Sequence, residues 1–326
     1  MTAPTPATSA TPSAVPAPGP WSGRGEPERT PRAELADAWR GFRTAARLGW
    51  QTEANWADPL LFVTYSVAKP VAGALILVFM VEVISAGRAD PALRAFVVIG
   101  SALWSFVMGG IAGLAMSVLE DRERYRMLKY LYVSPNSLLV LLLGRGLARV
   151  AIGGMGAGIT LLLGILFLGL PFDPAAVDWP LLALCMTLGL VAIVAMGLTL
   201  AAVSMQTRQD AWQYPEAVAG ALFLLVGAVF PLAVLPFAVQ LVGLITPLTW
   251  WLEGVRRALF PGAVTAVGGD GSAWAQLTGS GAPDAGTIAL ALLATTVLVT
   301  LASLACFRWS ERRAKERGLF DQTTGS

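Results

Sequence analysis

The sequence predicts an all-α integral membrane protein with six transmembrane helices, an N-terminal amphipathic helix on the membrane surface and a broken re-entrant segment between spans five and six. Of its 326 residues, 55% are hydrophobic and 13% are charged, about half the charged share of an ordinary soluble domain. Its apolar runs are long enough to cross a bilayer, which takes about 20 residues. Its charges gather in a few short segments between those runs.

Five of the six spans follow directly from these runs. Four runs are free of charge, and a fifth contains only Lys69 and Glu82, near its ends. In order, the predicted spans are Pro59–Ser85, Ala95–Leu119, Val150–Phe172, Trp179–Thr207 and, at the end of the chain, Ala285–Phe307.

The remaining run, Ala217–Leu252, is 36 residues long, which is too long for one upright helix and too short for two. Pro231, Pro236 and Pro247 divide it, and proline inside a helix removes a backbone hydrogen bond and clashes with the preceding turn. We therefore expect a full crossing from Glu216 to Val234 and a re-entrant segment over residues 235–260. Such backbone is tolerated at membrane depth only against protein or water.

The N-terminal and C-terminal segments differ in composition from the transmembrane domain. Residues 1–31 are rich in Pro and Ala and lack the apolar core of a secretory signal, so this tail is expected to be disordered. Residues 32–58 carry Leu35, Trp39, Phe42 and Ala46 at helical spacing among arginines, which predicts the membrane-surface helix. The transmembrane domain then spans residues 59–310, and residues 311–326 form a basic tail.

Basic residues predict the orientation. Six arginines precede the first span, four basic residues lie within residues 120–135 with Arg145 and Arg149 just beyond, and five follow Phe307, whereas the loop with Asp173 and Asp178 has none. The positive-inside rule places both termini and residues 120–135 in the cytoplasm. On the other side, Arg256 and Arg257 stand three and four residues after Glu253, a spacing that allows local pairing.

Composition excludes several kinds of chemistry. Histidine is absent, which removes His-based acid–base catalysis, Ser–His nucleophiles and His-ligated zinc. Cys185 and Cys306 lie in apolar runs and are interpreted as packed hydrophobes. A net charge of +2 gives no argument for a nucleic-acid partner. We expect no catalytic residues, no metal site and no cofactor on this chain.

The segment Glu120–Pro135, EDRERYRMLKYLYVSP, has seven charges in sixteen residues. Tyr125, Leu128, Leu131 and Tyr132 recur at helical steps, which predicts an amphipathic helix that ends before Pro135. Because its charges alternate in sign, it suits docking of a protein surface with mixed charge. An ordinary solvated loop that obeys the positive-inside rule is equally compatible with the pattern.

Two stretches resemble the type-2 ABC transporter permeases. One is LEDRERYRMLKYLYVSPNSLLVLLLGRGLA, with an acidic–Arg–Glu cluster, a Ser-Pro and a Gly-Arg at the next helix. The other is LLVGAVFPLAVLPFAVQLVGLITPLTWWLEGVRRALF, with Phe-Pro, Leu-Pro and Thr-Pro-Leu-Thr. The resemblance covers roughly residues 32 to 310. Thr246-Pro247 replaces the usual Asn-Pro, and the N-terminal tail is unusually long.

The resemblance implies a bacterial cytoplasmic-membrane exporter subunit driven by a separate ABC ATP-binding subunit, two copies of which bind ATP and Mg²⁺. Consistent with this, the sequence contains no Gly-x-x-x-x-Gly-Lys-Ser/Thr phosphate loop. The permease would pair with a second copy or a related chain among membrane lipids. Charged residues of the cytoplasmic segment would dock the ATPase, with a smaller contact, or an inert loop, at Arg208 and Asp210. The predicted docking residues are Glu120, Asp121, Arg122, Glu123, Arg124, Arg126, Lys129, Tyr130, Arg208 and Asp210.

A broken helix pair would shape the exit on the other side. The residues predicted for translocation and this outer gate are Phe230, Pro231, Leu235, Pro236, Pro247, Trp250, Trp251, Glu253 and Arg256. Trp250 and Trp251 are favoured as interfacial anchors over a substrate clamp. Lys69 and Glu82 either snorkel to the interface or act on cargo or a lateral gate. Gly109-x-x-x-Gly113 and Gly154-x-x-x-Gly158 permit close helix packing, either within one subunit or at a dimer seam.

Two other functions compete. A secondary transporter or channel commonly shows repeated halves with matching interrupted helices, but only one broken segment is present here. A membrane enzyme such as a lipid-linked transferase needs clustered carboxylates for a metal or an activated nucleophile, but Glu120, Asp121 and Glu123 alternate with arginines. The few polar groups in the spans fit amphipathic or lipid-like cargo better than a sugar chain, and together with the family resemblance they lead us to expect an amphipathic drug, a lipid or a glycoconjugate as cargo.

Overall fold

The computed structural model describes residues 31–54, 64, 68–88, 90–134, 137–170, 172–207 and 212–317. This part of the chain forms only helices and turns. In chain order the elements are α1 (Pro31–Ala54), α3 (Lys69–Ile84), α4 (Pro91–Val107), the π-helix η2 (Met108–Ala112), α5 (Gly113–Glu123), α6 (Leu128–Val133), α7 (Leu138–Phe167), α8 (Trp179–Gln206), α9 (Gln213–Leu225), the 3-10 turn η3 (Leu232–Val234), α10 (Phe237–Ile245), α11 (Pro247–Leu259), α12 (Ala273–Thr278) and α13 (Ala285–Glu316).

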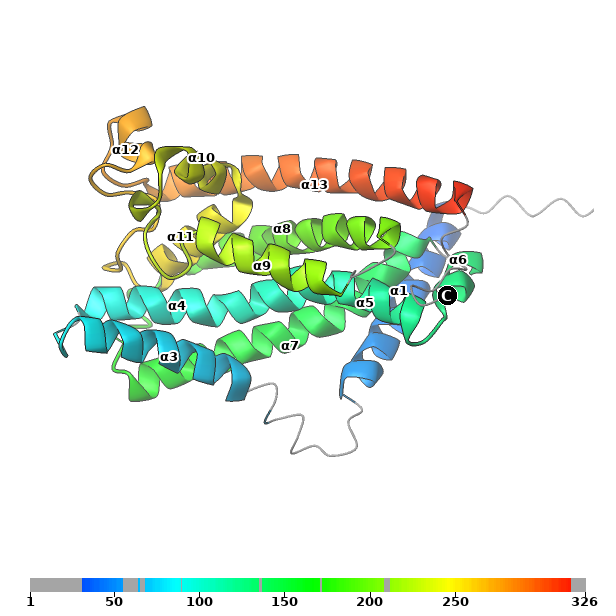
Figure 1. Cartoon of the computed structure of the whole chain (residues 1–326), viewed down its shortest axis with the longest axis horizontal. Helices are drawn as coiled ribbons and strands as arrows, with labels where there is room; N and C mark the ends of the chain where they lie inside the picture. Colours follow the sequence, from blue (N-terminus) through cyan, green and yellow to red (C-terminus); the bar gives the residue numbers. More distant parts are fainter. Residues whose placement is uncertain are drawn as a thin grey trace, which may run out of the picture.

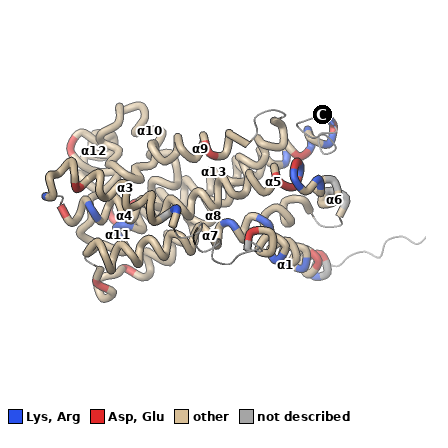
Figure 2. The backbone as a smooth tube through the Cα atoms, turned by 60° about the horizontal axis from the view of Figure 1, so that its bottom comes forward, with Lys and Arg blue, Asp and Glu red and all other residues tan. Residues whose placement is uncertain are grey.

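The long helices run side by side along the longest axis of the molecule (Figure 1). Helix α8 packs on α13, α11 and α5, while α7 packs on α1 and α4. Helices α10, α11 and α12 gather at one end. Helix α6 and the C-terminal end of α13 lie at the other end (Figure 1). Charged residues gather at these two ends, and a largely uncharged middle separates them (Figure 2).

Several helix starts follow from the local sequence. Asp90 caps α4 by accepting a hydrogen bond from the backbone nitrogen of Ala92 at 2.9 Å, and Pro91 follows it at the first position. Asp178 caps α8 in the same way through Leu181 at 3.0 Å. A carboxylate cap satisfies a backbone N–H that has no partner in the first turn, and proline is tolerated there because its missing N–H is not needed.

Four helical segments among the described residues are long and apolar enough to cross a membrane: Pro91–Glu123, Leu138–Phe167, Trp179–Gln206 and Ala285–Glu316. They contain the predicted second, third, fourth and sixth spans almost completely. The apolar part of α3, Val71–Ile84, is shorter, and most of the first half of the predicted first span lies outside the described residues. The count of six spans therefore stays a prediction.

The predicted fifth span is longer than the helix that forms there. Helix α9 ends at Leu225 instead of Val234, because Gly227 takes a left-handed φ of +69° that a helix cannot continue through. Two helices, α10 and α11, then follow with a joint at Thr246-Pro247. The break at Pro247 was correctly predicted. We call α10 and α11 together the α10–α11 hairpin.

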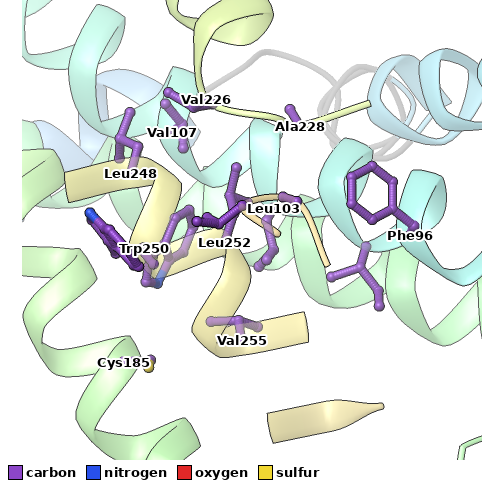
Figure 3. Close-up of a cluster of buried hydrophobic side chains, with 14 of the residues drawn as sticks. Phe96, Leu103, Val107, Cys185, Val226, Ala228, Leu248, Trp250, Leu252 and Val255 are labelled. Atoms are coloured by element: carbon purple, nitrogen blue, oxygen red, sulfur yellow. The ribbon is translucent and has the colours of Figure 1, made fainter. Parts of the chain in front are cut away.

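Helix α11 lies at the centre of the larger hydrophobic core. Its Trp250, Leu252 and Val255 face side chains of α4 and α8, among them Phe96 and Cys185 (Figure 3). Helix α11 is buried over nearly its whole length. A helix buried on all sides must satisfy its own polar groups inside the protein, and this requirement shapes the site described next.

Candidate functional site

The chain turns sharply where a continuous helix was predicted. Helix α5 ends at Glu123, residues 124–127 form a turn that we call the α5–α6 elbow, and α6 begins at Leu128. Arg126 in this turn has a left-handed φ of +51°. The backbone nitrogen of Met127 donates to the Asp121 carbonyl at 2.9 Å. The single helix expected over residues 120–135 is therefore wrong.

Burial explains the turn. Leu128 is only 2% exposed and packs in a second hydrophobic cluster with Leu138, Leu142 and Phe307. A straight extension of α5 would leave the hydrophobic residues of α6 without this cluster. The turn thus exchanges a few helical hydrogen bonds for apolar burial, which contributes about 1.5 to 3 kcal/mol for a fully buried leucine.

An ion pair lies beneath the elbow. Asp121 of α5 and Arg145 of α7 meet at 2.8 Å, with 0% and 3% of their side chains exposed. The next residue, Arg122, is also buried and donates to the backbone oxygen of Ser204 in α8 at 3.1 Å and to Glu123 at 2.7 Å. These side chains fasten α5 to α7 and α8.

A second ion-pair group joins three helices. Arg149 of α7 binds Glu53 of α1 and Glu120 of α5, each at 2.6 Å. Close packing supports this junction, because a Cβ on Gly49 of α1 would lie 2.7 Å from the Arg145 carbonyl oxygen. Helix α1, the elbow and α7 are therefore held as one unit.

The predicted docking residues consequently divide into two groups. Asp121 and Arg122 are buried, and Glu120 and Glu123 are only partly exposed and bind arginines, so these four form internal contacts rather than a free surface. Arg124, Arg126 and Tyr130 are exposed. The side chain of Lys129 and all of Arg208 and Asp210 lie outside the described residues.

At the opposite end, the α10–α11 hairpin uses its charges differently. Glu253 accepts from the hydroxyl of Thr265 at 2.5 Å and from the backbone nitrogen of Ala266 at 2.7 Å. Arg256 donates to the backbone oxygen of Ala228 at 2.6 Å and lies 3.8 Å above the ring of Phe96.

The expected local pair between Glu253 and Arg256 or Arg257 is therefore wrong. Arg257 donates to the carbonyl of Pro283 at 2.7 Å. Within residues 212–317 no salt bridge joins Glu253 to either arginine. The broken backbone around α10 and α11 supplies polar groups that these side chains satisfy instead.

The two tryptophans of the hairpin are not interfacial anchors. Trp250 is 3% exposed and donates to the Leu244 carbonyl at 2.7 Å, and Trp251 is 0% exposed. Trp251 lies directly against Gly189 of α8, where a Cβ would come within 2.1 Å of the indole ring. Among the other predicted gate residues, Pro247 is buried, Pro236 is exposed, and Phe230, Pro231 and Leu235 are half-buried.

A cavity of about 630 Å³ opens between α3, α7, α9 and the continuous α4–η2–α5 segment. Leu77, Trp104, Met108 and Phe223 contribute apolar surface to its wall. Its volume lies within the range of small-molecule sites, about 300 to 1,000 Å³. The π-helix η2 contributes Met108, Gly109 and Ala112, and such helical irregularities are frequent at functional sites. No pattern in the sequence predicted either the π-helix or the cavity.

Comparison with known proteins identifies the family. The sequence model of the ABC-2 type transporter matches residues 44–260, which is 217 of the 326 residues. This chain belongs to the ABC-2 type transporter family. A search of curated protein sequences found no significant match. The matched range includes the elbow, the cavity and the α10–α11 hairpin.

Membership confirms the resemblance seen in the sequence. An ABC-2 permease is a membrane subunit of an ABC transporter, generally non-catalytic, and works with a partner ATP-binding subunit. Among the described residues, no group of three or more His, Cys, Asp or Glu is placed to hold a metal ion.

The structure also places the remaining candidates of this ABC-2 permease. Glu82 of α3 pairs with Arg94 of α4 at 2.6 Å, so it has a partner within the protein. Gly109 and Gly113 face α7, where a Cβ on Gly109 would lie 2.5 Å from the Arg149 carbonyl oxygen. That motif packs within one chain. A Cβ on Gly158 would meet open space.

Proposed function

We propose that this ABC-2 permease exports an amphipathic compound across a bacterial cytoplasmic membrane, driven by an ATP-binding subunit that docks on the α5–α6 elbow. ATP and Mg²⁺ would bind that partner. The observation that supports docking here is the contrast between exposed Arg124, Arg126 and Tyr130 and the buried ion pair directly beneath them. An exposed contact surface on a rigid base can transmit a displacement.

The charge of the exposed surface limits which kind of partner surface can dock there. The sequence pattern suggested a docking partner with mixed charge, but the acidic residues Glu120 and Asp121 bind arginines of α7. The charged residues left exposed at the elbow are basic. We therefore expect an acidic groove on the ATP-binding subunit, since complementary potentials steer and orient association.

The ion pairs suggest a route for the motion. A displacement of the elbow would move α7 through Asp121–Arg145 and would move α1 and α7 together through Arg149. Helix α7 also lines the 630 Å³ cavity through Ile152 and Gly153. ATP-driven closure of the partner would thereby change the cavity walls. Two permeases, identical or related, would form the complete transporter.

The test of docking is charge reversal at the elbow. The double variant R124E/R126E should remain folded, lose co-purification of the ATP-binding subunit and lose ATP-dependent transport in vesicles. Its controls are R124K/R126K, which keeps the charge, and R88E, which reverses an exposed arginine between α3 and α4. Unchanged co-purification and transport by R124E/R126E would refute the docking site. Transport driven by a proton gradient without ATP would refute the whole proposal in favour of a secondary transporter.

The orientation needs its own test. Single cysteines at positions 124 and 88, in a chain whose Cys185 and Cys306 are replaced by serine, can be labelled with a membrane-impermeant maleimide. We expect labelling of position 88 in intact cells and of position 124 only after permeabilisation. The reverse pattern would invert the proposed topology.

A further inference from the structure

The cavity has a polar end and an apolar end. Its wall along α4–η2–α5 extends over the sixteen residues from Ser101 to Met116, and the fifteen helical steps between these two residues correspond to about 22 Å. Trp104 and Phe223, whose rings lie 4.7 Å apart, line its apolar part with Leu77. The cavity is thus elongated, and its chemistry changes along its length.

The charged residues of the cavity wall lie at the end of the cavity opposite to this apolar part. Lys69 is the first residue of α3, Glu216 lies in the first turn of α9, and Arg149 lies in the first half of α7. These three helices all run from the elbow side of the molecule toward the hairpin side (Figure 1). Glu53, in the last turn of α1, completes the charged end.

Two of these four charges are already satisfied. Arg149 and Glu53 bind each other, and Arg149 also binds Glu120. Among the described residues, Lys69 and Glu216 make no salt bridge or side-chain hydrogen bond. The cavity therefore offers one exposed ammonium and one exposed carboxylate for a ligand, next to an apolar compartment.

We infer that the cavity binds a zwitterionic amphiphile, with its anionic group on Lys69, its cationic group on Glu216 and its hydrocarbon tail between Leu77, Trp104 and Phe223. A phosphocholine or phosphoethanolamine head on an aliphatic chain has this chemistry. This inference deepens the proposed function by naming the cargo class, and it rests on that function. Lys69 thereby gains a role beyond snorkelling.

The head-group assignment is tested on the purified full-length chain in a neutral detergent. Binding of dodecylphosphocholine, dodecyl phosphate and dodecyltrimethylammonium, each below its micelle concentration, is measured by native mass spectrometry. The three probes share one tail and differ in the charged groups of their heads. The zwitterion should bind roughly tenfold or more tightly than either of the other two probes, because each of those leaves one of the two wall charges, Lys69 or Glu216, without an opposite charge.

Two variants separate the charges. K69Q should reduce binding of dodecylphosphocholine and dodecyl phosphate but leave binding of dodecyltrimethylammonium unchanged. E216Q should reduce binding of dodecylphosphocholine and dodecyltrimethylammonium but leave binding of dodecyl phosphate unchanged. E34Q, an exposed carboxylate of α1, is the control and should change nothing. Equal binding of all three probes, or equal effects of K69Q and E216Q on both dodecyl phosphate and dodecyltrimethylammonium, would overturn the assignment.

A matched pair of glycine variants tests the tail site. Gly73 lines the cavity and Gly158 does not, and a Cβ at either position would meet open space. G73L should fill the cavity and reduce binding of every probe, whereas G158L should bind normally. Equal binding by both variants would place the tail elsewhere. Because the assay contains no ATP-binding subunit, its outcome is independent of docking, and R124E/R126E should bind the probes like the wild type.

Discussion

The elbow end and the hairpin end of this permease both bury charge, but they do so by different means. Beneath the elbow, acids and bases from α1, α5 and α7 bind one another. In the hairpin, Glu253 and Arg256 form no salt bridge with each other and bind backbone groups of the chain around Ala228 and Ala266. The first arrangement ties separate helices together, and the second completes a broken helix. Side-chain pairs between helices can shift with those helices, whereas side chains bound to backbone fix a local shape.

The largest effect is expected from breaking the buried pair beneath the elbow. D121A leaves Arg145 buried without its partner, and removal of one member of such a pair costs about 3 to 5 kcal/mol. Thermal unfolding of the purified chain measures the loss. The double variant D121A/R145A should be less destabilised than the sum of the two single variants. Strict additivity would show that the two residues do not act as a pair.

At the hairpin end, disturbing the backbone contacts is expected to lower the free energy of unfolding nearly as much as breaking the Asp121–Arg145 pair. A Cβ on Gly100 would lie 1.7 Å from the Ala228 carbonyl oxygen, which accepts the Arg256 hydrogen bond. G100A must therefore displace the backbone there, at a cost of about 1 to 3 kcal/mol. G220A places a Cβ in open space and serves as the control. Equal unfolding temperatures for the two variants would contradict the packing of α4 against this turn.

The hydrogen bond from Arg256 to the Ala228 carbonyl provides a second test at the hairpin end. R256L removes the donor to Ala228 but keeps much of the apolar contact with Phe96, so we expect a loss of about 1 to 3 kcal/mol for the unsatisfied carbonyl. The double variant E253Q/R256L should show only weak coupling, because the two side chains bind different partners and no salt bridge joins them. Strong coupling between the two residues, measured with a double-mutant cycle of unfolding free energies, would instead support the local ion pair that the sequence suggested.

The smallest change in stability belongs to the exposed arginines. R124A should alter the free energy of unfolding by less than about 0.5 kcal/mol, as is usual for surface positions. R122A, only two residues earlier, removes the bond to the Ser204 carbonyl and should destabilise the chain clearly more. Equal unfolding curves for these neighbours would mean that the elbow does not separate an internal from an external surface.

Much of the fold was predictable because it depends on local composition. Apolar runs located the second, third, fourth and sixth long helices, although α7 begins twelve residues before the predicted Val150 and α13 ends nine residues after Phe307, and Pro247 marked the joint between α10 and α11. Side-chain pairing was harder. The spacing of Glu253 and Arg256 permits a local pair, but buried backbone groups nearby have a stronger need for partners. Likewise, the three-residue periodicity around Leu128 could not reveal that its burial bends the chain.

By itself, the sequence determined the membrane class, the long helices and the family, because these depend on chain-wide hydrophobicity and on motifs that are contiguous along the chain. The tertiary structure alone decided which charges are internal. Glu53, Glu120 and Arg149 are far apart in sequence and meet only when α1, α5 and α7 pack. The same packing leaves Arg124 and Arg126 exposed and brings Lys69 and Glu216 to one cavity. Ion pairs and cavities arise from distances between helices, and no pattern along a single helix encodes those distances.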